Sequence, residues 1–174
     1  LRRSAIGCVG PDLFGREMHY LFGRQGVRTN YLLTAPNGWD TCVYTKPMQG
    51  QIEANRIDFG NHNTLSDSLF AQLLDALNGL LPQLDVLIIN QQFRRPLLTP
   101  DRIGPLNDLI GQHPSVCYMA DLRDSGSLMR GVTLKVNTAE LARFLHLALP
   151  EIADLNWCIE HGTTLARQLN GPVV

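Results

Sequence analysis

The stretch "DVLIINQQFRRPLLTPDRIGPLNDLIGQHPSVCYMADLRD", residues 85–124, decides the fold. It opens with the apolar run "DVLII", which predicts a buried strand because strands of parallel sheets are apolar on both faces. Thr99 and Pro100 suit the N-cap and first turn of a helix whose inner face includes Ile103 and Ile110. "VCYMAD" predicts a second strand. This order predicts two parallel strands joined by a helical crossover.

The alternation of strands and helices continues on both sides of this stretch. Residues 5–9 are a short apolar run, and Asp12 and Gly26 suit the two ends of the helix that follows. "VTLKV" predicts a further strand, and residues 137–149 and 150–169 have helical periodicity. A further helix is predicted by leucines at steps of four, at Leu65, Leu69, Leu73 and Leu77. The chain is therefore predicted to be a layered α/β domain with a mostly parallel sheet.

Residues 28–60 depart from this pattern and predict a small β-rich flap, here called the lid. The segments "NYLLT", "TCVYTK" and "IEANRIDF" are rich in β-formers, and Gly, Pro and Asn residues separate them. They predict two or three antiparallel strands. Glu53, Arg56 and Asp58 stand among the apolar residues. One face of the lid is therefore expected to meet solvent, substrate or another chain.

The composition sets limits on partners and location. The 174 residues include 15 basic and 16 acidic ones, so no overall charge attracts nucleic acid or an anionic membrane. The four cysteines form no C-x-x-C pair and lie near no histidine at zinc-ligand spacing. We therefore expect a reduced, cytoplasmic protein. Every apolar run is far shorter than the roughly 20 residues that a membrane-spanning helix needs.

Polar clusters follow three of the predicted strands. "NQQ" begins at Asn90, "DLRD" begins at Asp121, and "KVN" begins at Lys135. Ligands of such sheets bind beyond the carboxyl ends of the strands, so these clusters are candidates for one binding edge. The alternative is that strand ends are polar only for solvation, and the residues alone leave both interpretations open.

Asn137 and Glu140 lie three residues apart at the start of a predicted helix. Asn at the N-cap with Glu at the third helical position is close to a capping box, worth about 1 kcal/mol to the helix. The same geometry offers free amide groups to a phosphate, and the carboxylate can hold a magnesium ion through water. The structural and the functional interpretation are compatible.

Four basic residues are candidates for an anionic ligand: Lys46, Arg56, Arg123 and Lys135. Solvation alone is the alternative for each of them. The five histidines form no metal-binding or catalytic arrangement, and the serines lack a G-x-S-x-G turn. The glycines form neither G-x-G-x-x-G nor a P-loop. Metalloprotease, triad-hydrolase, dinucleotide-binding and P-loop functions therefore have no support.

Taken in order, these segments resemble the central part of a ribokinase-like (PfkB-type) carbohydrate kinase. "IGCVGPDLFGREMHYLFGRQGVRTNYLL" resembles the family's G-x-x-G-x-D-x-x-G stretch. "YTKPMQGQIEANRIDFG" resembles the flap over the sugar, "VLIINQQ" and "CYMADLRD" the strand ends near the substrate, and "LKVNTAEL" the N-x-x-E motif. "NRIDF" and "ADLRD" look closest to heptose-phosphate kinase-like branches. The resemblance covers nearly the whole chain.

The resemblance implies a layered α/β/α fold with a lid, and phosphoryl transfer from Mg-ATP to a sugar or sugar-phosphate hydroxyl. Asn137, Glu140 and Lys135 would lie near ATP, with Glu140 holding Mg²⁺ through water. The implied substrate-binding residues are Lys46, Arg56, Asn90, Asp121 and Arg123. The lid would close over the substrate and is a possible homodimer contact.

Two segments of the family pattern are not found in these 174 residues. The glycine-rich sugar-binding segment is expected before Leu1, and the G-A-G-D segment with the catalytic aspartate is expected after Val174. We therefore expect little or no kinase activity from this chain alone, because loss of a general base costs roughly 10²–10⁴-fold. The alternative is a non-catalytic α/β module that binds a sugar or nucleotide, or dimerises.

Overall fold

The computed structural model describes residues 2–36, 38–92 and 95–174, and the chain forms two compact units. Unit 1 is Leu1–Gly79 and unit 2 is Leu80–Val174. Both contain parallel strands and helices, which confirms the predicted α/β class. Within the described residues, no helix is both long and apolar enough to span a membrane.

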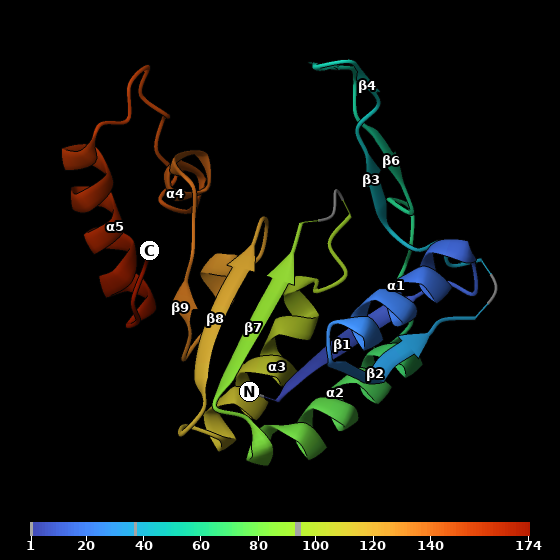
Figure 1. Ribbon diagram of the computed structural model, residues 1–174. Coiled ribbons are helices and arrows are strands. Elements are labelled where there is room, and N and C mark those ends of the chain that lie inside the picture. The colour runs from blue at the N-terminus through green and yellow to red at the C-terminus, as the bar shows by residue number, and fades with distance from the viewer. Residues whose placement is uncertain (1, 37, 93–94) are drawn as a thin grey trace. The chain divides into compact units, whose positions relative to one another are not determined.

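Unit 1 begins with two parallel strands joined by a helix (Figure 1). Strand β1 is Arg3–Val9, helix α1 is Leu13–Arg24, and strand β2 is Val27–Thr34. Asp12 caps α1, since its Oδ1 accepts a hydrogen bond of 2.8 Å from the amide of Gly15. Gly26 follows the helix with φ +67, a left-handed conformation that favours glycine. Both predicted helix ends are confirmed.

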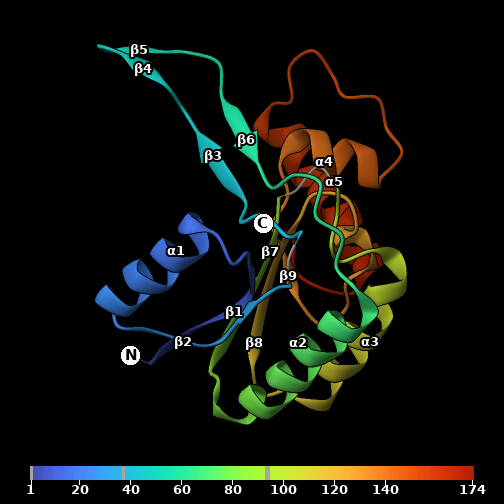
Figure 2. The same cartoon turned by 90° about the vertical axis from the view of Figure 1, so that its right-hand side faces the viewer.

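The lid begins later in the sequence than predicted. The segment "NYLLT" lies in β2 and pairs in parallel with β1, so its prediction as an antiparallel lid strand is wrong. The reason is the α1 crossover, which returns the chain beside β1 and buries Leu32 there. The strands of the lid are short and antiparallel: β3 (Val43–Thr45) with β6 (Ile57–Phe59), and β4 (Met48–Gln49) with β5 (Ile52–Glu53). The lid projects from the rest of unit 1 (Figures 1 and 2).

Helix α2, Asp67–Leu80, follows the lid and ends in the 3-10 helix η1, Leu81–Gln83. Leu69 and Leu77 are buried, as the leucine spacing predicts, whereas Leu73 is half-buried. The helix begins at Asp67, so Leu65 precedes it, although Leu65 is buried as well.

Unit 2 contains a parallel sheet in the order β7-β8-β9. Its elements are β7 (Val86–Gln91), α3 (Pro100–Gln112), β8 (Cys117–Leu122), the 3-10 helix η2 (Gly126–Leu128) and β9 (Thr133–Leu134). The strand–helix–strand prediction for residues 85–124 is confirmed. The predicted strand "VTLKV" forms over Thr133 and Leu134 alone.

The apolar strand β7 is buried on one face instead of two. Leu87 and Ile89 are buried, whereas Val86 and Ile88 are 55% and 65% exposed. Helix α3 lies along one face of the sheet (Figures 1 and 2), and its Ile103 and Ile110 are buried. The prediction that β7 is buried throughout is therefore wrong, because successive side chains of a strand point to opposite faces and those of only one face are buried here.

The C-terminal helices are shorter than their sequence period predicts. Helix α4 is Thr138–Phe144 and α5 is Leu155–Leu169, in place of residues 137–149 and 150–169. His146, with φ 57, stands just beyond the end of α4, and the Asp154 side chain caps α5 by accepting a hydrogen bond of 2.8 Å from the amide of Trp157. After α5, Val173 bridges in parallel to Leu134 and extends the sheet.

Candidate functional site

The carboxyl ends of β7, β8 and β9 form one polar edge in unit 2, here called the rim. Asn90 and Asp121 are partners in the β7–β8 register, and the amide of Lys135 donates a hydrogen bond of 2.9 Å to Ala120 O. Lys135 Nζ lies 3.0 Å from Asp121 Oδ2, and Gln92 Nε2 donates to Asp121 Oδ1 at 2.8 Å. The prediction that the three strand-end clusters share one edge is confirmed. Their function at that edge stays a prediction.

Asn137 and Glu140 form a complete capping box at the start of α4. Asn137 Oδ1 accepts a hydrogen bond of 2.8 Å from the Glu140 amide, and Glu140 Oε2 accepts one of 2.9 Å from the Asn137 amide. Glu140 is only 6% exposed, so its carboxylate is enclosed at the helix start. The structural interpretation of this pair is confirmed. Phosphate and Mg²⁺ binding remain predictions for it.

The basic residues predicted to bind anions fall into both units. Lys46 and Arg56 are on or beside the lid, whereas Lys135 and Arg123 are at the rim. Lys46 Nζ pairs with Glu53 at 2.9 Å, and Arg56 Nε pairs with Asp58 Oδ1 at 2.7 Å. Lys135 is paired with Asp121 as described above. Three of the four cations therefore already have a carboxylate partner.

Arg123 lies just after β8 with its side chain exposed. Its carbonyl oxygen accepts a hydrogen bond from the guanidinium group of Arg143, and Arg143 also pairs with Asp124 at 3.3 Å. These contacts fix the backbone of the loop, and the Arg123 guanidinium forms no ion pair with a carboxylate among the described residues. Arg123 is the candidate cation with the most freedom to meet a ligand.

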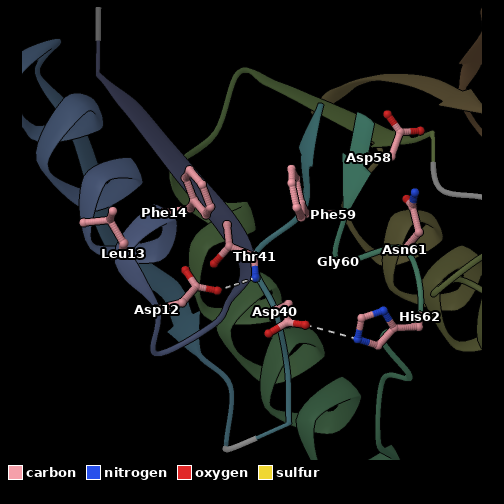
Figure 3. A pocket seen from close by; sticks show the side chains of 10 residues that line it. All are labelled: Asp12, Leu13, Phe14, Asp40, Thr41, Asp58, Phe59, Gly60, Asn61 and His62. Atoms are coloured by element: carbon pink, nitrogen blue, oxygen red, sulfur yellow. Dashed lines mark hydrogen bonds and ion pairs between the residues drawn. The ribbon is translucent and has the colours of Figure 1, made fainter. Parts of the chain in front are cut away.

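A pocket that sequence reasoning missed lies at the base of the lid, here called the lid root (Figure 3). Its volume is about 420 Å³. Its lining includes Asp12, Phe14, Asp40, Asp58, Phe59 and His62. The rings of Phe14 and Phe59 face each other with centroids 6.4 Å apart. Two aromatic rings and several polar side chains thus converge on one hollow, as in sites for small polar molecules.

Asp12 joins the lid to the start of α1. Besides capping the helix, it accepts a hydrogen bond of 2.7 Å from the Thr41 amide through Oδ2. Burial alone would raise the pKa of Asp12, but the hydrogen bonds from Thr41 and Gly15 lower it below its ordinary value. Thr41 Oγ1 in turn accepts a hydrogen bond of 2.8 Å from the Gly10 amide. The Asp12 carboxylate therefore stays ionised at neutral pH and clamps the lid root.

Glycines allow this close approach. A Cβ at Gly10 would lie 2.4 Å from Trp39 O, and one at Gly15 would lie 2.2 Å from Gly10 O. No side chain fits at either position without a shift of the backbone. The G-x-x-G-x-D-x-x-G stretch therefore has a structural explanation at the lid root.

The two chain segments that enter and leave the lid are held together by side chains. Asn63 accepts a hydrogen bond of 3.1 Å from the Asp40 amide and donates one of 2.6 Å to Asp40 O. Cys42 Sγ donates to Gly60 O at 3.1 Å, and burial raises the pKa of that thiol. His62 Nε2 lies 3.1 Å from Asp40 Oδ2. These contacts hold in place the two chain segments that line the pocket.

Sequence reasoning missed most of this pocket because its residues come from three separated segments, 12–14, 40–41 and 58–62. The Asp12 signal was present in the G-x-x-G-x-D-x-x-G stretch, but it indicated a helix cap alone. Phe14, Asp40 and His62 belong to no motif. Only the lid hairpin brings them together.

Several solved structures share this fold, and some of them are sugar kinases. No protein-family model matches the sequence, and no curated protein matches it. The match with the 2-dehydro-3-deoxygluconokinase of Thermotoga maritima covers 98% of this chain and 55% of that protein, with a TM-score of 0.70 and 13% identity. The match with the ribokinase of Giardia lamblia covers 98% of this chain and 50% of that protein, with a TM-score of 0.65 and 14% identity.

The match with a possible 1-phosphofructokinase of Thermotoga maritima covers 97% of this chain and 52% of that protein, with a TM-score of 0.62 and 15% identity. The chain thus spans about half the length of these structures. At such identities the likeness establishes the fold. The fold is ribokinase-like, and the predicted resemblance is confirmed at that level.

Proposed function

We propose that this chain is part of a carbohydrate kinase that transfers the γ-phosphoryl group of Mg-ATP to a hydroxyl of a sugar or sugar phosphate. The observation that carries the proposal is the rim on a ribokinase-like fold, where Lys135, Asp121 and the capping box follow neighbouring parallel strands. Ligands of open parallel sheets bind at this end of the strands.

The residues of the rim suit a nucleotide with its metal ion. An ammonium group, an amide and a carboxylate are the donor set that phosphate and a hydrated Mg²⁺ require. Lys135 and Asn137 would contact the phosphates, and Glu140 would hold Mg²⁺ through a water molecule. The ion, when bound, would neutralise the charge that phosphoryl transfer develops. Glu140 can serve in this way without leaving the cap, because the cap uses its Oε2.

Each unit offers its own candidates for orienting the acceptor: Asn90, Asp121 and Arg123 at the rim of unit 2, and Lys46 and Arg56 of the lid in unit 1. Orientation of this kind supplies much of the rate in phosphoryl transfer, because the protein has little covalent chemistry to perform. The general base is assigned to no residue of these 174. The four free cysteines support a cytoplasmic location.

We also propose that two copies of the chain pair through their lids. Five large apolar side chains of the lid are at least 43% exposed: Tyr44, Met48, Ile52, Ile57 and Phe59. Exposed apolar side chains that gather on one element mark interaction surfaces. Sedimentation should therefore find a dimer of the wild-type chain and a monomer of the Ile52→Glu variant. A wild-type chain that stays monomeric at about 100 µM, a concentration at which even a weak complex forms, would contradict the pairing.

The kinase proposal is tested by phosphoryl transfer from radiolabelled ATP with Mg²⁺ and a panel of sugars and sugar phosphates. The assay compares the 174-residue chain with the natural gene product that contains it. We expect turnover by the gene product and little or none by the chain alone. A gene product that binds Mg-ATP and sugar but transfers no phosphate would contradict the proposal.

A non-catalytic binding module is the second candidate. The observation that favours it is that Lys135 and Glu140 already have partners within the chain, Asp121 and the Asn137 amide. Calorimetry separates the two functions when it is paired with the turnover assay. Binding of sugar or Mg-ATP by the gene product without turnover is the result expected of a module.

A further inference from the structure

We propose that Arg143 is a positioning residue, which holds the loop after β8, residues 123–125, so that Arg123 presents its guanidinium group to a phosphate group. The inference rests on the proposed function, because it concerns how a cation of the rim meets the phosphate of a nucleotide or a sugar phosphate. Arg143 acts through the loop and not on the ligand, since both of its terminal nitrogens donate to loop residues.

Arg143 reaches the loop from helix α4 and contacts two consecutive residues. Its Nη2 donates a hydrogen bond to the carbonyl oxygen of Arg123, and its Nη1 donates one of 3.3 Å to Asp124 Oδ1. Because a guanidinium group carries its donors in one rigid plane, the two contacts fix the direction of the loop as well as its position. The carboxylate of Asp124 also balances the charge of Arg143.

The backbone of Arg123 is held from two sides within unit 2. Its amide donates a hydrogen bond of 3.3 Å to Gln91 O at the end of β7, and its carbonyl oxygen accepts the one from Arg143. Two residues further on, Ser125 is buried and its Oγ donates to Leu98 O at 3.0 Å. The backbone that carries the Arg123 side chain is thus ordered by three separate segments of the chain.

Helix α4 is itself fixed against the loop. Its capping box closes the first turn, and Leu141 and Ala142 are buried. The ring of Phe144 lies against Gly126, where an added Cβ would be only 3.3 Å from two ring atoms. The guanidinium carbon of Arg143 lies 5.3 Å from the centroid of the same ring. Arg143 therefore stands at a packed junction between the helix and the loop, although its side chain is 49% exposed.

Arg123 is the member of this arrangement whose side chain remains available. It is exposed and forms no ion pair with a carboxylate in the part of the chain that the structure describes. A guanidinium group can donate two parallel hydrogen bonds to a phosphate, a contact with strict geometry. A loop that is ordered before binding lowers the entropic cost of that contact. Presenting Arg123 therefore gives Arg143 a task beyond its exposed ion pair, which contributes little to stability.

The test is a double-mutant cycle in the natural gene product, with Arg123→Met, Arg143→Met and the variant that carries both changes. Methionine keeps the apolar stem of each side chain, and urea denaturation shows that each variant is folded. Calorimetry measures the dissociation constants of three probes: Mg-ATP, D-fructose 6-phosphate and D-mannose 6-phosphate. The nucleotide and the two sugar phosphates distinguish the two sources of the phosphate group.

We expect each single variant to weaken binding of the same probe by about fivefold, the scale of one exposed charge contact. The double variant should bind that probe no more weakly than Arg123→Met, because Arg143 acts through Arg123. Effects that multiply in the double variant overturn the proposal. An effect of only one single variant, or no binding by any probe, overturns it as well.

Two controls separate positioning from a general effect of charge. Arg167→Met makes the same change of net charge in the last turn of α5, and it should alter each affinity by less than about twofold. D-Fructose lacks the phosphate, so Arg143→Met should not weaken its binding. An equal effect of Arg167→Met on the sensitive probe, or an equal loss for D-fructose, overturns the assignment of Arg143 to phosphate recognition.

Failure of this inference differs from failure of the kinase proposal. Turnover by the natural gene product, with multiplying effects of the two substitutions, overturns the inference and leaves the kinase function in place. Coupled effects on binding without any turnover by the gene product support the positioning role and contradict the kinase function.

Discussion

The lid root and the rim are both polar, but they use their polar groups differently. At the rim, Lys135 closes on Asp121 and Glu140 is buried in its capping box. At the lid root, Phe14 and Phe59 are half-exposed around an open pocket. The N-x-x-E motif and the strand-end clusters therefore identify the rim, where polar side chains form hydrogen bonds and ion pairs with one another. The region with uncovered surface is created by tertiary structure, and Asp12 is the one lining residue that the G-x-x-G-x-D-x-x-G stretch specifies.

The largest expected effect is on the lid root, where Asp12 has two structural tasks. Asp12→Ala removes the α1 cap and the acceptor of the Thr41 amide, and should lower the free energy of unfolding by about 2 kcal/mol. Asp154→Ala is the matched control, because Asp154 caps α5 through the Trp157 amide. It should cost about 1 kcal/mol. Urea denaturation measures both, and equal losses would show that the Thr41 contact adds nothing.

The same carboxylate makes the lid root sensitive to acid. The pKa of Asp12 is lower in the folded chain than its ordinary value of 3.8, so ionised Asp12 stabilises the fold. This stabilisation is present above pH 3.8 and is lost as the pH falls through the lowered folded-state pKa. Denaturation measured between pH 5 and about pH 2 should show that the free energy of unfolding falls less with pH in Asp12→Asn than in the wild-type chain. Parallel curves for the two proteins would contradict this assignment.

At the rim, Asn137→Ala separates helix capping from phosphate binding. Loss of the cap should cost about 1 kcal/mol of stability, whereas Asn137→Ser keeps a capping oxygen and should cost less. In the natural gene product, Asn137→Ala should also lower kcat/KM by more than about tenfold at equal folded fraction, if Asn137 contacts phosphate as we propose. Unchanged kcat/KM would leave Asn137 with its structural role alone.

The smallest effects are expected for the ion pairs. The side chains of Lys135 and Asp121 are 46% and 26% exposed, so Lys135→Met should cost about 0.5 kcal/mol or less. Lys46→Met on the lid, where both partners are about half-exposed, should cost no more than that. Thermal unfolding in low and high salt compares the two pairs. A loss above about 1 kcal/mol at Lys135 would mean that the ion pair is a main support of the rim.

The parts of the molecule that local patterns determine were predictable. The apolar run of β7, the Pro100 helix start and the Asn137–Glu140 cap depend on residues a few positions apart. Long-range pairing was harder: residues 30–34 have the composition of a lid strand, and only their parallel register with β1 places them elsewhere.

Burial of β7 was also misjudged, because an apolar strand does not reveal which of its faces a helix covers. Ile88 is as apolar as Ile89, yet it lies on the uncovered face of the sheet in unit 2. The lid-root pocket needs three distant segments to meet, and no periodicity encodes such a meeting.

The most direct test of the account is amide chemical-shift mapping of the isotopically labelled chain, titrated with a magnesium complex of a non-hydrolysable ATP analogue. The account predicts that the nucleotide shifts the amides of Lys135, Asn137 and Glu140 at the rim. Nucleotide shifts confined to the lid root, or no shift at the rim, would contradict the proposed binding of phosphate at the rim.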